Sequence, residues 1–90
     1  MKPVDIVREV GAERIAQDAK WGRSFEGRPD QQWLAILMEE VGEAAEEVLN
    51  GVHDVGGDHL LEREVIQIAA VCFSWLEFRT PFAEQIRRDV

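Results

Sequence analysis

The sequence predicts an all-α fold, and three observations support that prediction. The segment from Val4 to Lys20 is rich in helix formers and contains no proline. The segment from Asp30 to about Asn50 carries apolar residues at steps of three and four, which places them on one face of a helix. No stretch has a competing strand pattern, and the chain has no repeats or low-complexity tracts. We therefore expect a bundle of about three main helices with a short C-terminal helix.

The first helix is expected to begin at Pro3, because proline is tolerated in the first helical turn. Gly11 weakens this helix without ending it. The glycines and the proline between Gly22 and Pro29 predict a loop. Asp30 is the expected N-cap of the second helix, and Gly51 is expected to stop it. The apolar seam of the second helix consists of Trp33, Leu37, Val41, Ala44 and Val48.

A turn at residues 53–57 is expected to separate the second and third helices. Asp58 is the expected N-cap of the third helix, which runs to roughly Arg79 and ends at Thr80–Pro81. The amphipathic tail from residue 82 onward predicts a last helical turn or two.

The third helix is unusually apolar, because nearly every residue from Val65 to Leu76 is hydrophobic. A helix that is apolar all round is buried on every side. Three other helices in a chain of 90 residues can scarcely cover it. We therefore expect a second copy of the chain to complete the bundle, as a homo-oligomer.

The composition describes one small domain, residues 1–90, with an acidic surface. Hydrophobic residues make up 46% of the chain, enough for a core, and a formal net charge of −8 argues against direct nucleic-acid binding. The first ten residues lack the apolar core of a signal peptide, and no segment is long enough to span a membrane. The single cysteine, Cys72, lies in an apolar run and is interpreted as a small buried hydrophobe. We expect a cytoplasmic protein that binds cations, or binds nucleotides through a metal.

Two acidic motifs lie on the second and third helices. Glu39, Glu40 and Glu43 form a Glu-Glu-x-x-Glu motif, and Glu64 and Gln67 form a Glu-x-x-Gln motif. Glu40 and Glu43 are three residues apart and share a helix face, so they can hold one ion between them. Glu64 and Gln67 interrupt apolar surroundings, where a carboxylate and an amide are costly unless they are paired or coordinated. We expect them to face Glu40 and Glu43 across a helix pair, with Mg²⁺ between the helices.

Ser74 lies two turns beyond Gln67 and is expected to continue the same polar stripe. An alternative interpretation needs no metal. The acidic residues of the second helix then form an ordinary solvated face, the helix dipole favours Glu64 near its helix start, and Gln67 bonds another buried polar group. The spacing alone leaves both interpretations open.

These residues resemble the MazG-type all-α nucleoside triphosphate pyrophosphohydrolases, which carry Glu-Glu-x-x-Glu on one helix and Glu-x-x-Asp on the next. Upstream, Gln17, Lys20, Trp21 and Gly22 are similar to the Gln-x-x-Lys-Trp-Gly signature of short MazG-like proteins, many of them from phages and bacteria. The resemblance covers roughly residues 13–77. The acidic motif alone is weak, whereas its combination with the upstream signature and the apolar third helix is fairly specific.

The resemblance implies a MazG-like helical bundle that hydrolyses a (deoxy)nucleoside triphosphate to the monophosphate and pyrophosphate, with Mg²⁺ or Mn²⁺ as cofactor. It implies a homodimer or a homotetramer. Carried over by position, Glu40, Glu43 and Glu64 are the metal ligands, and Glu39 assists the metal shell or orients the attacking water. Lys20 and Trp21 are the expected substrate-binding residues.

Gln67 departs from the family pattern, because it stands where the family has an aspartate. Its carbonyl oxygen can ligate Mg²⁺, so we include it in the ligand set, but it brings no charge and the affinity should fall. Asp54 or Asp58 in the adjoining turn is a candidate source of the missing charge. Lys20 has two further cations nearby in the sequence, Arg23 and Arg28, as possible phosphate contacts.

Two other functional classes remain open on the sequence. A degenerate MazG-like protein would bind a nucleotide or a protein partner without turnover. An acidic helical module would serve only for interaction with another protein. Release of pyrophosphate from a nucleotide, and binding of a metal ion, separate these classes from the enzyme.

Overall fold

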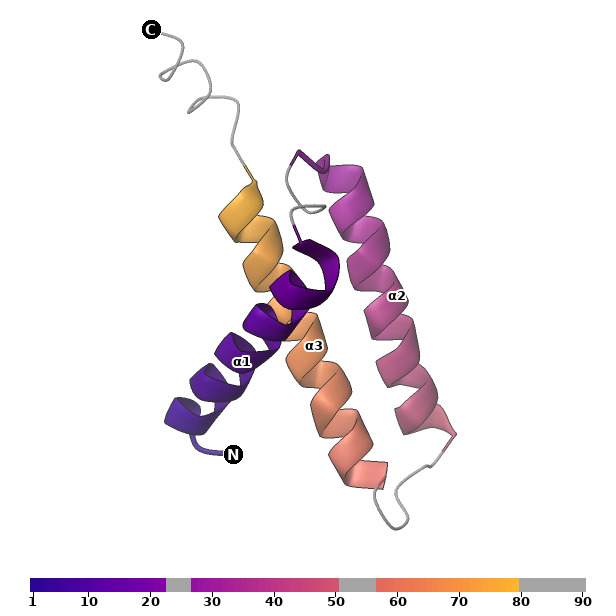
Figure 1. Cartoon of the computed structure of the whole chain (residues 1–90). Coiled ribbons are helices and arrows are strands. Elements are labelled where there is room, and N and C mark those ends of the chain that lie inside the picture. Colours follow the sequence, from indigo (N-terminus) through magenta and orange to yellow (C-terminus); the bar gives the residue numbers. More distant parts are fainter. Residues whose placement is uncertain (23–26, 51–56, 80–90) are drawn as a thin grey trace, which may run out of the picture.

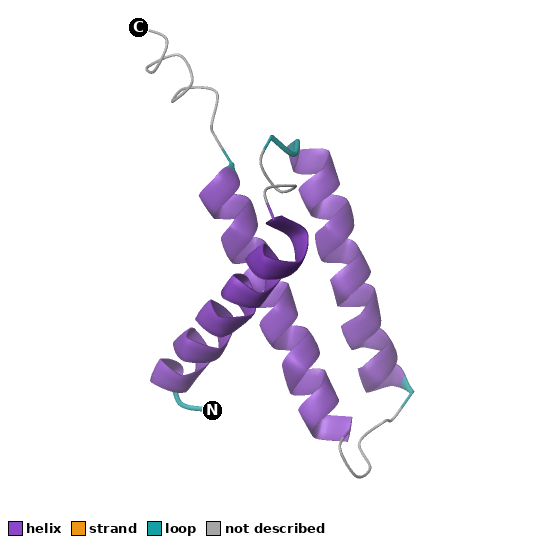
Figure 2. Ribbon diagram, in the orientation of Figure 1, coloured by secondary structure: helices purple, strands orange, loops and turns teal. Residues whose placement is uncertain are grey.

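A computed structural model describes residues 1–22, 27–50 and 57–79 of the chain, with the side chains of Gly57 and Asp58 left undescribed. Within these ranges all long regular elements are helices, and there is no strand (Figure 2). The helices are α1, Pro3–Trp21, α2, Asp30–Leu49, and α3, Gly57–Phe78. The all-α prediction is confirmed. None of these helices is long and apolar enough to cross a membrane.

Helix α3 is the central element of the bundle, because it packs against both α1 and α2. Helix α2 lies alongside α3, whereas α1 crosses α3 obliquely (Figure 1). Two faces of α3 are therefore covered within the chain. This arrangement brings the middle of α2 and the first half of α3 next to the C-terminal half of α1.

The core lies toward one end of the α2–α3 pair and is built on Trp33. The Trp33 side chain is 1% exposed and packs with the buried Val71. The Phe78 ring stacks on Trp33, with ring centroids 6.5 Å apart and ring planes within 7° of each other. Trp75 is half-buried against the same cluster. The seam residue Trp33 therefore lies in the core, and Trp75 packs at its edge.

Helix α1 is held to α3 mainly through Arg14, whose side chain is buried. Its guanidinium donates hydrogen bonds to Asp18 Oδ1 at 2.8 Å and to Glu77 Oε2, and it lies 5.8 Å from the Phe78 ring centroid. Burial acts to lower the pKa of Arg14, but the bonds to both carboxylates outweigh burial and raise it. Removal of either carboxylate would leave a buried charge without full compensation.

The prediction that Asp30 caps α2 is wrong. Pro29 occupies the N-cap position with an extended backbone and provides no side-chain cap, and Asp30 is the first residue of the helix. The Asp30 carboxylate is instead turned toward α3, where it accepts hydrogen bonds from Trp75 Nε1 at 2.8 Å and from Arg79 Nε at 3.2 Å. A tertiary contact therefore takes precedence over the local cap, and it ties the start of α2 to the end of α3.

The remaining boundaries lie within a residue or two of those expected. Pro3 stands at the start of α1, Gly11 does not interrupt that helix, and Asn50 forms the C-cap of α2. Helix α3 begins at Gly57, one residue before the expected cap at Asp58. The predicted turn before Gly57, the stop signals at Gly51 and Thr80–Pro81, and the predicted C-terminal helix lie outside the described residues.

Apolar side chains extend well beyond the core. On α2 the seam is buried at Trp33 and half-buried at Leu37 and Ala44, whereas Val41 and Val48 are exposed. On α3, Phe73 is 55% exposed and Leu76 is 77% exposed. The single chain therefore leaves part of its most apolar helix uncovered.

Candidate metal centre and adjoining cavities

Three carboxylates converge between α2 and α3. One oxygen from each of Glu40, Glu43 and Glu64 lies within 4.8 Å of the other two. The three-residue spacing of Glu40 and Glu43 places both on one face of α2, and the packing of α3 on α2 brings Glu64 to them. Oxygen ligands of an octahedral Mg²⁺ ion lie roughly 3 to 4 Å apart, so oxygens within 4.8 Å of one another would need to close in only slightly to share one ion. Hard oxygen donors are also the ligand type that Mg²⁺ prefers.

The electrostatic environment of the cluster favours protonation of its half-buried members. Burial raises the pKa of Glu40, as does repulsion from Glu43 and Glu39, while Lys20 acts in the opposite direction. Burial also raises the pKa of Glu64, together with repulsion from Glu43 and a hydrogen bond with it. Burial and mutual repulsion therefore both oppose the ionised form of these carboxyl groups. A bound cation would remove that cost.

Gln67 lies among these carboxylates, as the sequence predicts. With its amide nitrogen turned to them, it donates to Glu40 Oε2 at 3.2 Å and to Glu64 Oε2 at 3.3 Å. In this arrangement the amide partly offsets the negative charge of the cluster through N–H donors. To ligate a metal, Gln67 would have to turn its amide over and present the oxygen.

Ser74 does not belong to this polar group, and the expectation that it continues the stripe is wrong. Its side chain is fully buried, and Oγ donates to the carbonyl oxygen of Ala70 at 3.0 Å in the preceding turn. A serine inside a helix satisfies its hydroxyl in this way without any partner from another helix.

Glu39 and Glu47 lie beside the three-carboxylate cluster. Glu39 borders a cavity together with Glu40, but it contributes no oxygen to the cluster itself. Glu47 Oε2 is buried without a hydrogen-bond partner among the described residues, and repulsion from Glu47 contributes to the raised pKa of Glu64. Glu47 is not among the site residues predicted from the sequence, although its spacing of four residues from Glu43 indicates a shared helix face.

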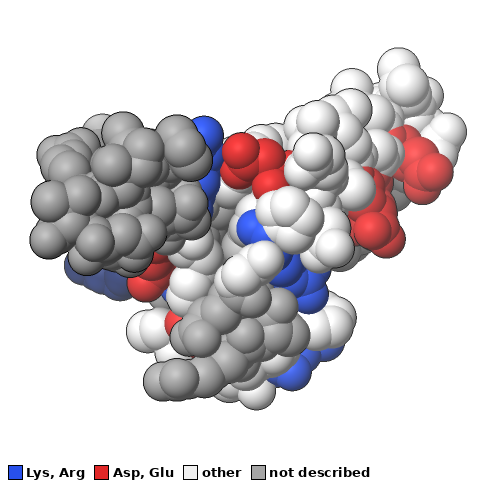
Figure 3. All heavy atoms as spheres, turned by 90° about the horizontal axis from the view of Figure 1, so that it is seen from above, with Lys and Arg blue, Asp and Glu red and all other residues white. Residues whose placement is uncertain are grey.

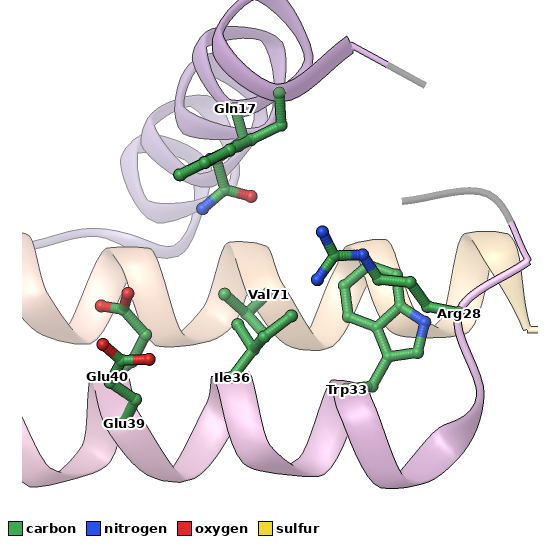
Figure 4. Close-up of a pocket in the computed structure, with 8 residues that line it drawn as sticks. Gln17, Arg28, Trp33, Ile36, Glu39, Glu40 and Val71 are labelled. Carbon is green, nitrogen blue, oxygen red and sulfur yellow. The ribbon is translucent and has the colours of Figure 1, made fainter. Parts of the chain in front are cut away.

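An apolar cavity of about 220 Å³ adjoins the cluster (Figure 4). Trp33, Ile36 and Val71 form its apolar wall, and Glu39 and Glu40 lie at one end. Its volume is below the roughly 300 to 1,000 Å³ of pockets that enclose a whole drug-sized ligand. The cavity is therefore suited to one flat apolar group of a larger molecule whose polar part lies nearer the glutamates.

Helix α1 covers this cavity with Gln17 and Trp21, which are one helical turn apart. The Gln17 side chain extends from α1 toward the cavity (Figure 4). Its Oε1 atom is buried and has no hydrogen-bond partner among the residues that the structure describes. Arg28 borders the opposite end of the cavity from Glu39 and Glu40 (Figure 4).

A second, more polar cavity of about 310 Å³ is also lined by Glu40. Lys20 and Trp21 of α1 line it together with Arg63 and Gln67 of α3. Lys20 Nζ lies 4.8 Å from the centroid of the Trp21 ring, a cation–π contact. Both predicted substrate-binding residues therefore lie beside the cluster, and Arg63 is a cation at the same place that sequence reasoning did not single out.

Basic and acidic side chains also lie next to each other at the end of the molecule seen in Figure 3. His59 is exposed. Arg23 and Asp54 lie outside the described residues, as does the side chain of Asp58. Cys72 is half-buried, so the prediction that it is a buried hydrophobe is met only in part.

Comparison of the chain with protein-family models, with curated proteins and with solved structures finds no match in any of the three. The residues of this chain and their geometry are therefore the basis for assigning a function.

Proposed function

We propose that this protein is a MazG-like, Mg²⁺-dependent hydrolase that converts a (deoxy)nucleoside triphosphate to the monophosphate and pyrophosphate. The observation that carries the proposal is the approach of Glu40, Glu43 and Glu64 to within 4.8 Å across two helices. The sequence motifs predict this set of residues independently of the coordinates. The two cavities that meet at Glu40 provide space for an aromatic base and for phosphates.

In this proposal each residue of the cluster has a separate task. Glu40, Glu43 and Glu64 hold the ion, and Mg²⁺ or Mn²⁺ when bound neutralises phosphate oxygens and lowers the pKa of a water molecule. Glu39, beside the cluster but outside it, accepts a hydrogen bond from the attacking water and orients it. Lys20 and Trp21 contact the nucleotide from α1.

We also propose that the protein works as a homodimer or homotetramer. The support is the apolar surface left on α3, where Val65, Phe73 and Leu76 are each more than half exposed. Exposed apolar groups on one helix of a small protein are typical of an interface between subunits. Sedimentation equilibrium checks the proposal, and a monomer at micromolar concentration would contradict it.

The activity test is pyrophosphate release from a panel of NTPs and dNTPs with Mg²⁺ or Mn²⁺. The wild type should release pyrophosphate, and Glu40→Gln should abolish release without unfolding the protein. Glu46→Gln is the matched control, because Glu46 is an exposed glutamate of the same helix that is not part of the cluster. Metal-independent hydrolysis, or equal activity in both variants, would refute the proposal.

The orientation of Gln67 favours a second candidate function, nucleotide binding without turnover. Its amide donates to Glu40 and Glu64, so a neutral group takes part of the role that a cation would have. Gln67→Asp separates the two functions. In a weakened enzyme this change should tighten Mg²⁺ binding and raise turnover, whereas in a protein that uses a structural amide here it should mainly lower the melting temperature, because it adds a fourth carboxylate.

A further inference from the structure

The two cavities beside the carboxylate cluster differ in the groups they offer to a ligand. Both are bordered by Gln17, Trp21 and Glu40, so one ligand can reach into both. The apolar cavity has Trp33 and its neighbours as a wall, whereas the polar cavity has cations from two different helices, Lys20 and Arg63. A molecule with an aromatic end and an anionic end is complementary to this pair of cavities.

Arg63 is well placed to meet the anionic end. It is four residues before Gln67 on α3, so both side chains lie on one face of the helix, and Gln67 contacts Glu40. Its side chain is exposed and makes no ion pair within residues 1–22, 27–50 and 57–79. The guanidinium therefore retains its donors for a ligand.

The neighbouring cations are less suited to this task. Lys20 already lies against the Trp21 ring and offers a point charge, whereas the planar fork of an arginine matches phosphate oxygens with two parallel hydrogen bonds. Arg28 lies at the far end of the apolar cavity, away from Glu39 and Glu40 (Figure 4). An anion close to the carboxylates thus meets Arg63 and Lys20, and not Arg28.

The charge of the cluster makes such a cation necessary. Glu40, Glu43 and Glu64 repel a polyphosphate, and one divalent ion offsets only part of the combined negative charge. A cation on the opposite side of the phosphates reduces that repulsion without competing with the metal for the carboxylates. Arg63 lines the same polar cavity as Glu40 and is carried by a different helix, so it can supply this cation.

We infer that Arg63, assisted by Lys20, is the residue that binds the pyrophosphate part of the nucleotide in the polar cavity, with the base in the apolar cavity beside Trp33. The inference rests on the proposed function for the identity of the ligand. The substrate is then oriented with its base toward the core and its leaving pyrophosphate toward the first half of α3.

The test is calorimetric binding of inorganic pyrophosphate, in the presence of Mg²⁺, to the wild type and to Arg63→Gln, Arg63→Lys and Arg8→Gln. Arg8 is the matched control, because it is an exposed arginine of α1 that pairs with Asp5 at 3.7 Å and lines neither cavity. Arg63→Gln should weaken binding about 10- to 100-fold, the usual effect of one charged hydrogen-bonding group. Arg63→Lys should recover part of the loss, and Arg8→Gln should bind as the wild type does. Thermal melting checks that each variant is folded.

Two results would overturn the inference: a wild type that does not bind pyrophosphate, or an Arg63→Gln variant that binds as tightly as Arg8→Gln. The proposed hydrolysis can fail separately. Pyrophosphate binding that depends on Arg63, in a protein without turnover, would leave the anion site in place and reject the enzyme.

Discussion

Replacement of Glu40 by glutamine should have opposite effects on the metal-free and the metal-bound protein. The substitution keeps the shape of the side chain and its acceptor oxygen for Gln67 but removes one of three clustered charges. At a separation of 4.8 Å, two unit charges repel each other by about 0.9 kcal/mol even at the dielectric constant of water. Glu40 takes part in two of the three repulsive pairs in the cluster, those with Glu43 and with Glu64. After allowance for screening by salt, the metal-free variant should be more stable by about 1 to 2 kcal/mol.

That gain corresponds to a rise in melting temperature of roughly 5 to 15 °C for a domain of this size. For the wild type, Mg²⁺ at ten times its dissociation constant should add about 1.4 kcal/mol of stability. The variant should gain little from Mg²⁺. Melting followed by circular dichroism at neutral pH, with Mg²⁺ varied and with chelator as the metal-free reference, measures both effects at once.

The matched control is again Glu46→Gln, which removes the same charge from the same helix outside the cluster. It should leave the response to Mg²⁺ intact and change the metal-free melting temperature by much less. The reasoning is refuted if Glu40→Gln destabilises the metal-free protein, or if Mg²⁺ stabilises it as much as the wild type.

Three further predictions follow from single features of the structure. Stabilisation by Mg²⁺ should be full at neutral pH and disappear as the pH falls through the raised pKa values of Glu40 and Glu64, because protons then compete with the metal for both carboxylates. Melting temperatures measured with and without Mg²⁺ across a pH series check this. A stabilisation by Mg²⁺ that does not change with pH would contradict it. Gln17→Leu removes a buried oxygen that has no hydrogen-bond partner among the described residues, so it should raise the melting temperature and weaken nucleotide binding in calorimetry. A loss of stability would indicate that the oxygen is satisfied. Asp30→Asn should lower the melting temperature at neutral pH, and the difference from the wild type should shrink in acid. The hydrogen bond from Trp75, followed by the charge and hydrogen bond of Arg79, lowers the pKa of Asp30 in the folded protein. The stability that this carboxylate contributes is therefore present above its unfolded-state pKa and is lost as the pH falls through its folded-state pKa. Equal melting of the Asp30 variant and the wild type at neutral pH would remove the basis of that argument.

The helices and the acidic cluster were accessible from the sequence because both depend on local periodicity. The step of three or four residues identifies the face that carries Trp33, and the same step pairs Glu40 with Glu43. Glu64 interrupts an apolar helix, and a carboxylate in that setting requires a partner. Two such faces on consecutive helices indicate where the helices meet, so the three glutamates are predicted to converge before any coordinates exist.

The errors arise where a side chain has a choice of partners. Asp30 has the residue type and position of a cap, yet it bonds Trp75 and Arg79 on another helix, a pairing that depends on the packing of α2 on α3. Ser74 has the position of a residue in the polar stripe of Gln67, yet its hydroxyl donates to the carbonyl oxygen of Ala70 in its own helix. Periodicity fixes the face of a residue but does not determine which available group its side chain selects.

Arg14 and Arg63 are two residues of the same type whose surroundings differ in a way that periodicity does not predict. Both are arginines with acidic neighbours in the sequence, and no sequence rule separates them. The structure gives Arg14 two carboxylates and an aromatic ring and buries it, whereas Arg63 remains exposed at the edge of a cavity. The crossing of α1 over α3 decides this difference, and the crossing is a property of tertiary packing.

Gln67 is the position at which the sequence and the geometry have to be combined. The sequence has a neutral residue where the resembled family has a fourth acid, and its amide lies beside Glu40 and Glu64, where the nitrogen is the end that can donate to both carboxylates. A neutral donor at this point lowers the repulsion within the metal-free cluster, so the fold is less dependent on a cation than it would be with aspartate. The same property weakens the attraction for the cation, because the ligand set then holds three formal charges in place of four. Glu47, with a buried oxygen that lacks a described partner and a repulsive effect on Glu64, is near enough to restore part of that charge. The strength of metal binding therefore depends on Gln67 and Glu47 together, and Glu47→Gln should weaken Mg²⁺ binding more in the wild type than in the Gln67→Asp background.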